Sequence, residues 1–195
     1  MTQPERTLVR DRERTRRMIL EAAEQAIEQQ GAGVSLAEIA TLAGVTKSGL
    51  LHHFRTRDIL IEAVFEHTVM RTWEEVRAQI DITENRPGKF TRAYVRAFTG
   101  DSEYLTHAAS PTGLYAVLGT HIATASHNAA QAADAQAWTA AFEADGLPIG
   151  RALAIRYAAE GLVAAMNCAY LTADHLARVR EELLALTETH DDSVQ

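Results

Sequence analysis

Residues 34–54 read VSLAEIATLAGVTKSGLLHHF, and this stretch decides how the N-terminal part of the chain folds. Ser35 and Glu38 stand three positions apart, the spacing of a capping box, in which each side chain pairs with the backbone amide of the other residue. Apolar residues then repeat at helical spacing until Gly44, which suits the left-handed end of a helix. Thr46 is a plausible N-cap for the next helix. The stretch therefore predicts two short helices joined by a tight turn.

Helices of about two turns do not bury enough surface to be stable alone, so these two need a third helix to pack against. An apolar stripe between Ile19 and Ile27 predicts that helix, with small or apolar residues at i, i+3, i+4, i+7 and i+8. Two short helices braced by a third are typical of a helix-turn-helix, whose second helix enters the major groove of DNA. The exposed positions of residues 46–53 are small, polar or basic and none is acidic, which favours contact with phosphates.

The remainder of the chain also shows helical periodicity, and no segment sustains the period of two that is typical of strands. The candidate helix starts are Thr56, Ser110-Pro111, Pro148 and Thr172. We expect the helix that follows Pro148 to reach about Leu171. The predicted fold class is all-α.

Composition and charge limit the classes of protein that need to be considered. The chain has 195 residues, a formal net charge of −7 and a single cysteine, Cys168, which excludes an internal disulfide framework. It holds neither an apolar run of the ~20 residues that span a membrane nor an N-terminal secretion signal. Residues 1–57 carry a formal charge of +2, whereas residues 58–195 carry −9. We therefore expect a cytoplasmic protein with a basic working end and no membrane partner.

Residues 44–54, GVTKSGLLHHF, followed by TRDIL at 56–60, resemble the DNA-binding signature of TetR-family transcriptional regulators. RMILEAA at 17–23 is similar to the first helix of that family, and the match covers about residues 12–65. The resemblance implies nine or ten helices, with an N-terminal three-helix helix-turn-helix domain and a C-terminal helical ligand-binding and dimerisation domain. It also implies a homodimeric repressor that binds a palindromic DNA operator and is released by a small-molecule effector.

We expect four parts along the chain. They are a flexible basic arm at 1–11, the helix-turn-helix DNA-binding domain at 12–57, the ligand-binding and dimerisation domain at 58–187, and a flexible tail at 188–195. Six arginines crowd the first seventeen positions. They act either as a phosphate-steering arm or as a solubilising face, since Asp11 and Glu13 are interleaved with them.

The candidate DNA-binding residues lie in and around the second short helix. They are Ser35, Thr46, Lys47, Ser48, Leu51, His52, His53 and Arg57. Lys47 and Ser48 are the candidates for reaching base edges, because they stand at the head of that helix. Ser35 and Thr46 either cap their helices only or also contact phosphate. The family commonly has tyrosine where this chain has Leu51.

The candidate ligand-binding residues are mostly aromatic and lie in the C-terminal part. They are Tyr94, Phe98, Tyr115, His121, Trp138, Phe142, Met166 and Asn167. Each of them lines either a pocket or the ordinary core, and for His121 a core histidine with satisfied hydrogen bonds is favoured. Glu160 faces either a cationic ligand or water.

Two C-terminal segments have the pattern of helices that pack closely against partners. Their interface candidates are Ala154, Ala158, Gly161, Ala165, Ala169, Leu176, Val179, Leu183 and Leu186. We expect these two helices to form half of an intermolecular four-helix bundle, because reading a palindrome requires two DNA-binding heads.

No sequence pattern of an enzyme is present, neither a glycine-rich phosphate loop nor a metalloprotease or hydrolase motif. His121, His127 and Asp134 lack the spacing of metal ligands. We therefore expect no enzyme activity, no cofactor and no bound metal. A helix-turn-helix regulator controlled by a protein partner, rather than by a small molecule, remains an alternative.

Overall fold

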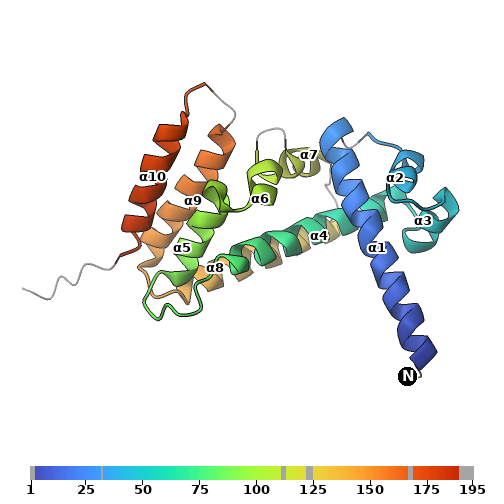
Figure 1. Ribbon diagram of the computed structural model, residues 1–195, viewed down its shortest axis with the longest axis horizontal. Coiled ribbons are helices and arrows are strands. Elements are labelled where there is room, and N and C mark those ends of the chain that lie inside the picture. The colour runs from blue at the N-terminus through green and yellow to red at the C-terminus, as the bar shows by residue number, and fades with distance from the viewer. Residues whose placement is uncertain (1–2, 32, 111–112, 122–124, 167–168, 189–195) are drawn as a thin grey trace, which may run out of the picture. The chain divides into compact units, whose positions relative to one another are not determined.

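The computed structural model describes residues 3–31, 33–110, 113–121, 125–166 and 169–188, while the side chains of residues 3–8 and 119–127 fall outside the description. These residues form ten α-helices and one π-helical turn, with no strand among them (Figure 1). The all-α prediction is confirmed. The chain packs as two compact units, Met1–Thr68 with Val117–Ala123, and Val69–Ala116 with Thr124–Gln195. Within the described residues, no helix combines the length and apolarity needed to cross a membrane.

The first unit holds α1 (Gln3–Gln30), α2 (Leu36–Leu42), α3 (Lys47–His53) and the beginning of α4 (Arg57–Ala78). The apolar stripe of α1 is buried as predicted. The fully buried side chains of this unit include Ile19, Ala23, Ile27, Ile39, Leu50, Phe54 and Leu60. Helices α1, α2 and α3 therefore pack around one core, and this packing orients α3.

The backbone of residues 3–11 is helical and continuous with α1, and the flexible arm expected at 1–11 stays a prediction. Arginine and glutamate are good helix formers, and extending a helix that is already nucleated costs little. The domain boundaries expected at residues 57 and 187 separate parts by function, whereas the two compact units are defined by packing. These boundaries therefore stay predictions.

Local interactions end and begin the helices where the sequence predicts. In the capping box, Ser35 Oγ accepts from Glu38 N at 3.2 Å, and Ser35 N donates to Glu38 Oε2 at 2.9 Å. Gly44 takes φ +68° in the turn between α2 and α3, a left-handed conformation that favours glycine. Thr46 caps α3 and Thr56 Oγ1 accepts from the amide of Ile59 in the first turn of α4.

The second unit contains α5 (Lys89–Arg96), a π-helical turn (Ala97–Asp101), α6 (Glu103–Ala108), the start of α7 (Leu114–His121), α8 (Ala125–Glu143), α9 (Ile149–Ala165) and α10 (Ala173–Ala185). Helices α5, α9 and α10 lie side by side in this unit (Figure 1). The core of this unit includes Tyr94, Phe142, Ile155, Val163 and Leu183.

Several helix boundaries in this unit differ from the sequence expectations. The helix after Ser110, α7, begins at Leu114. The expected helix start at Pro111 lies outside the described residues. The helix after Pro148 ends at Ala165, short of the expected Leu171. Thr172 caps the last helix as predicted, because its side chain accepts from the amide of His175.

The N-terminus of α5 is capped by a residue from another part of the chain. Its N-cap position is Gly88, which has φ +84° and no side chain to accept a hydrogen bond. Instead, the carboxylate of Asp145 accepts from Phe90 N at 2.7 Å and from Thr91 N at 2.8 Å. Thr91 Oγ1 also donates to Asp145 at 2.7 Å. The turn after α8 is thereby fixed to the start of α5.

Candidate functional site

The surface of α3 is exposed and carries no acidic side chain. Thr46, Lys47, Ser48 and His52 are exposed, while Leu50 is fully buried and attaches the helix to the core. A short helix that is fixed by one buried leucine and presents its other side chains to solvent suits contact with DNA. Leu51 and His53 are half-buried at the edges of this face.

Thr46 combines a structural role with an available hydroxyl proton. Its Oγ1 accepts from Gly49 N at 3.0 Å, which satisfies one free amide of the first turn of α3. The hydroxyl can still donate, because accepting a hydrogen bond does not use its proton. A Cβ at Gly49 would lie 3.2 Å from Thr46 Oγ1, so glycine leaves the cap unobstructed. The same reasoning holds for Ser35, whose exposed hydroxyl accepts in the capping box.

Basic side chains of α1 lie beside the C-terminal end of α3. The Arg16 guanidinium carbon lies 4.4 Å from the ring centroid of Phe54, the residue that ends α3. The pKa of His53 is lowered from its ordinary value of 6.5, mainly by burial and further by the positive charges of His52, Arg12 and Arg16. The His52 and His53 rings meet edge to face with centroids 5.9 Å apart. Positive charge is therefore concentrated where α1 passes α3.

Arg57 connects the start of α4 to the start of α2. Its guanidinium donates to the carbonyl of Val34, the residue before the capping serine Ser35. One nitrogen of the guanidinium is used in this bond, and the others remain for a further acceptor. The structure thus brings Arg57 and Ser35 together, 22 positions apart in sequence.

A buried polar group joins α1 to α4 within the first unit, and the sequence analysis did not identify it. Glu24 is 5% exposed, and its Oε1 lies 3.1 Å from His67 Nδ1. Thr68 Oγ1 donates to the same oxygen at 2.9 Å. Because buried polar groups need partners, this cluster fixes the register of α4 against α1.

Aromatic side chains of the second unit form one packed cluster. Trp73 and Trp138 stack with ring centroids 3.7 Å apart, and both indole N–H groups donate to the carboxylate of Asp134. Tyr94 and Phe98 stack at 4.3 Å. Asp134 was considered as a metal ligand from the sequence, and the structure gives it this role instead.

Charged groups contact the aromatic cluster from α9. Tyr94 Oη donates to Glu160 Oε1 at 2.5 Å, and Arg156 Nε donates to the same oxygen at 2.9 Å. Burial raises the pKa of Tyr94 well above its usual value of 10.0, and the nearby carboxylate of Glu160 raises it further. Glu160 is therefore engaged with a tyrosine and an arginine of its own unit.

The predicted ligand-binding residues are placed as follows. Tyr94, Phe98, Trp138 and Phe142 are buried in the aromatic cluster, Met166 packs at its edge, and Tyr115 shares a hydrogen bond with Thr72. The side chain of His121 and all of Asn167 lie outside the described residues. Whether the placed residues line a binding site or only a core stays a prediction. Trp73, Phe90 and Arg156 belong to the same cluster and were missed, since one sequence gives no sign of contacts between distant segments.

The predicted dimer residues divide between an outer face and the core. Ala154, Ala158, Gly161, Val179 and Leu186 are exposed on α9 and α10. Leu183 instead packs into the core of its own unit, at 5% exposure. No cluster of three or more potential metal ligands is found among the described residues.

Comparisons with known proteins identify the family. Residues 19–64 match the family model described as bacterial regulatory proteins, tetR family, and residues 88–188 match the model of the Tetracyclin repressor-like C-terminal domain. The second match alone spans more than half of the chain, so this protein belongs to the TetR family of bacterial transcriptional regulators. It carries the family's DNA-binding helix-turn-helix and is not an enzyme, as the sequence predicts.

Solved structures share the fold. A transcriptional regulator from Rhodococcus sp. RHA1 is 17% identical with a TM-score of 0.68, covering 88% of this chain and 95% of its own. A candidate TetR-family regulator from Rhodococcus sp. is 19% identical with a TM-score of 0.67, covering 89% and 97%. The multidrug binding protein EbrR, complexed with malachite green, is 21% identical with a TM-score of 0.61, covering 89% and 98%. A comparison with curated proteins found no significant match.

Proposed function

We propose that this regulator is a homodimeric repressor that binds a palindromic operator through α3 and is released by a small-molecule effector. The observation that carries the proposal is the exposed, acid-free surface of α3, which is capped at Thr46 and anchored by Leu50. Helix-turn-helix proteins place such a helix in the major groove, with its N-terminal residues at the base edges.

In this proposal, different residues contact the base edges and the phosphates. Lys47 and Ser48 stand in the first turn of α3 and contact bases. Ser35 and Arg57, which meet through the Val34 carbonyl, contact phosphate on one side of the groove. His52 and His53 contact phosphate at the other end of α3.

The exposed face of α9 and α10 supports a dimer. Ala154, Ala158 and Gly161 are small and exposed on this face of α9, so another helix can approach closely beside the exposed ring of Tyr157. Val179 and Leu186 add apolar surface on α10. Dimerisation through this face provides the two DNA-binding helix-turn-helix units that a palindromic operator requires. Their separation must be about 34–36 Å or a multiple of that distance.

We place the effector at the aromatic cluster of the second unit. Binding pockets are mostly apolar with a few polar groups, and this cluster combines stacked rings with Glu160, Arg156 and Asp134. The complex of EbrR with malachite green supports a small molecule as effector. Because α4 runs from Arg57 into the second unit, a ligand that tilts α4 changes the separation of the heads. Release requires that the ligand prefer the conformation that does not bind DNA.

A binding selection from random duplex DNA tests the proposal. The purified full chain should recover a palindromic sequence with half-sites one or more helical turns apart. The double variant Lys47→Ala/Ser48→Ala should lose this preference at fixed salt. Recovery of unrelated sequences would contradict the proposal.

The dimer interface needs a separate test with a matched control. Ala158→Glu places a charge on the exposed face of α9 and should shift the sedimentation mass to that of a monomer. Ala135→Glu places the same charge on an exposed face of α8 and should leave the mass unchanged. A dimer that survives Ala158→Glu but not Ala135→Glu would place the interface on α8.

A further inference from the structure

The guanidinium group of Arg156 lies among aromatic rings of the second unit. Its central carbon is between 5.5 and 6.0 Å from the centroids of four rings, those of Tyr94, Trp138, Phe142 and Tyr157. Aromatic faces attract a cation within about 6 Å of their centroids. We call these four rings, together with the carboxylate of Glu160, the cation cage.

The rings of the cation cage stand at steep angles to one another. Tyr94 meets Trp138 at an interplanar angle of 82° and Phe142 at 66°, with centroids 5.4 and 5.3 Å apart. Edge-to-face contacts of this kind leave ring faces available to a cation. These three rings are at most 5% exposed, whereas Tyr157 is 61% exposed. The cage therefore has three buried walls and one wall at the surface of α9.

Glu160 supplies the negative charge of the cation cage. Its Oε1 accepts from Tyr94 Oη at 2.5 Å and from Arg156 Nε at 2.9 Å. Burial and the Glu160 carboxylate raise the pKa of Tyr94 well above 10.0, so its hydroxyl stays protonated and keeps donating. The side chains of Arg156 and Glu160 are 18% and 35% exposed. The ion pair thus lies at the edge of the cage, where a solute can reach it.

We propose that the cation cage binds an organic cation with N–H donors, and that Arg156 fills the cage when no such cation is bound. The proposal rests on the proposed function, because it names the chemical class of the effector that we place at the aromatic cluster. The bound cation lies against the ring faces and donates to Glu160 Oε1 in place of Arg156 Nε. Guanidinium, amidinium and protonated amine groups have this chemistry.

The charges of the cage discriminate between classes of ligand. A neutral ligand that displaced Arg156 would leave the partly buried carboxylate of Glu160 without its positive partner, which is unfavourable. An anion would be repelled by the same carboxylate and by that of Asp134, which accepts from the Trp138 indole at 3.2 Å. A cation keeps the charge balance unchanged, because one positive group enters as another leaves.

Arg156 is held in a way that allows its replacement. Its partners are the Glu160 carboxylate and ring faces, and another cation can make each of these contacts. Arg92 of α5 provides a contrast within the same unit, since it is 2% exposed and donates to the backbone carbonyls of Pro87 and Thr187. Removing Arg92 from its site would break buried hydrogen bonds, whereas the Arg156 guanidinium can move into solvent beside the exposed Tyr157.

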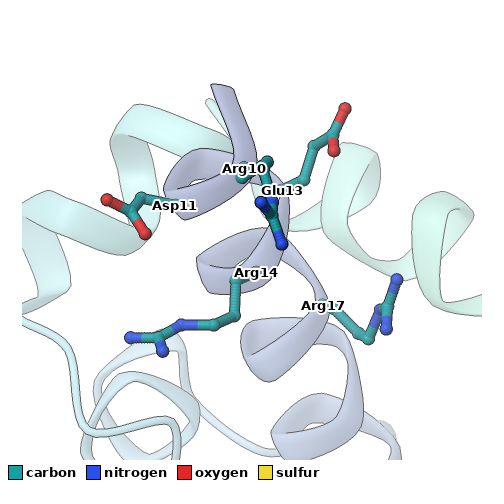
Figure 2. A pocket seen from close by; sticks show the side chains of 5 residues that line it. All are labelled: Arg10, Asp11, Glu13, Arg14 and Arg17. Atoms are coloured by element: carbon teal, nitrogen blue, oxygen red, sulfur yellow. The ribbon is translucent and has the colours of Figure 1, made fainter. Parts of the chain in front are cut away.

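A hollow of about 440 Å³ in the first unit has the opposite preference for charge. Figure 2 shows the side chains that line it, which are those of Arg10, Asp11, Glu13, Arg14 and Arg17. Its three arginines outweigh its two acids, so it repels a cation. Both tryptophans of the chain belong instead to the aromatic cluster, where Trp73 stacks on Trp138 at 3.7 Å. Tryptophan fluorescence therefore reports binding at the cation cage.

The test follows the tryptophan fluorescence of the full chain as N-propylguanidinium is added at constant ionic strength. This probe reproduces the end of an arginine side chain. N-propylurea is the control probe, because it has nearly the same shape and hydrogen-bonding groups without the charge. The cage variants are Arg156→Gln and Glu160→Gln. The matched control is Arg151→Gln, which removes the same charge from an exposed position of α9.

The wild-type fluorescence should change with N-propylguanidinium and stay constant with N-propylurea. Arg156→Gln should bind the cation about tenfold more tightly, because an internal group that fills a site about nine tenths of the time weakens its apparent affinity by that factor. Glu160→Gln should bind it about two- to fivefold more weakly, as expected for loss of a partly exposed ion pair. Arg151→Gln should bind it like the wild type. Circular dichroism shows whether each variant is folded, and the two probes on the wild-type chain decide the role of charge without any variant.

Three results would overturn the proposal. If neither the wild type nor folded Arg156→Gln responds to the cation, the cage is a packed core and Arg156 is a structural residue. If N-propylurea binds as tightly as N-propylguanidinium, charge does not select the ligand. If Arg156→Gln binds the cation no more tightly than Arg151→Gln, Arg156 does not compete for the site. A chain that binds the cation but no selected duplex would contradict the proposed function and still support the cation cage, so the two failures are distinguishable.

Discussion

Replacing Thr46 by aspartate should leave the folded chain about as stable as before and remove most of its affinity for DNA. Aspartate is as good an N-cap as threonine, and its carboxylate can accept the hydrogen bond from Gly49 N that Thr46 Oγ1 accepts at 3.0 Å. However, it has no hydroxyl proton to donate to a phosphate, and its charge repels the DNA backbone.

The size of each effect follows from the roles assigned to Thr46. Thr46→Ala removes the cap and should lower the free energy of unfolding by about 1 kcal/mol. A hydrogen bond to a charged acceptor contributes about 1.5 kcal/mol or more, and a dimer makes it twice. Loss of both copies should therefore raise Kd about a hundredfold or more. Thr46→Ser keeps the cap and the donor and should resemble the wild type in both properties.

Urea unfolding and fluorescence anisotropy at fixed salt measure the two effects separately. Thr46→Asp should unfold at the wild-type urea concentration and fail to bind the selected duplex. If Thr46→Asp bound the duplex as tightly as the wild type, the hydroxyl would be a cap only and would not face phosphate.

Three further predictions concern stability. Burial lowers the pKa of His53 from 6.5, so the unfolded chain takes up this proton first as pH falls, and unfolding free energy should drop below about pH 6.5. His53→Gln should lose less stability than the wild type between pH 7.5 and 5.5 in urea titrations, and equal losses would contradict the assigned environment. Asp145→Ala removes the acceptor for Phe90 N, Thr91 N and Thr91 Oγ1 and should lower the free energy of unfolding by about 2 kcal/mol or more. Asp145→Asn should lower it by an intermediate amount. An unchanged melting temperature of Asp145→Ala would refute the capping role. Glu24→Ala leaves His67 and Thr68 on α4 without their buried carboxylate partner and should lower the free energy of unfolding by about 1–3 kcal/mol, measured by thermal melting. An unchanged stability would show that water replaces the carboxylate.

The parts of the fold that the sequence predicted are those held by local interactions. The capping box at Ser35 and Glu38 spans three residues, and the turn at Gly44 depends on one backbone angle. Thr46 likewise bonds to an amide three positions along the chain. Because residue types and spacing determine such contacts directly, the helix-turn-helix could be located before its tertiary packing was known.

The contacts that the sequence did not reveal join distant segments. Trp73 and Asp134 are 61 positions apart, and Glu24 and His67 are 43 apart. No periodicity indicates which polar residue of one helix meets which residue of another. Asp145 is a further example, since a helix without its own capping side chain gives no sign of the residue that replaces it.

The N-terminal extent of α1 could not be predicted from the sequence, for a different reason. Residues 3–11 lack the apolar stripe by which an amphipathic helix is found, so their charge suggested an arm. The helical propensity of arginine and glutamate, together with a nucleus in the core, is sufficient to extend the helix. A helical segment without a buried apolar stripe is therefore not detected by hydrophobic periodicity.

Protection of guanine N7 from methylation tests the central assignment most directly, because N7 is exposed in the major groove. On the selected duplex, the wild-type chain should protect guanines in both half-sites. Lys47→Ala/Ser48→Ala should remove that protection while phosphate contacts persist. Wild-type binding that leaves every N7 in the half-sites reactive would show that α3 does not enter the major groove.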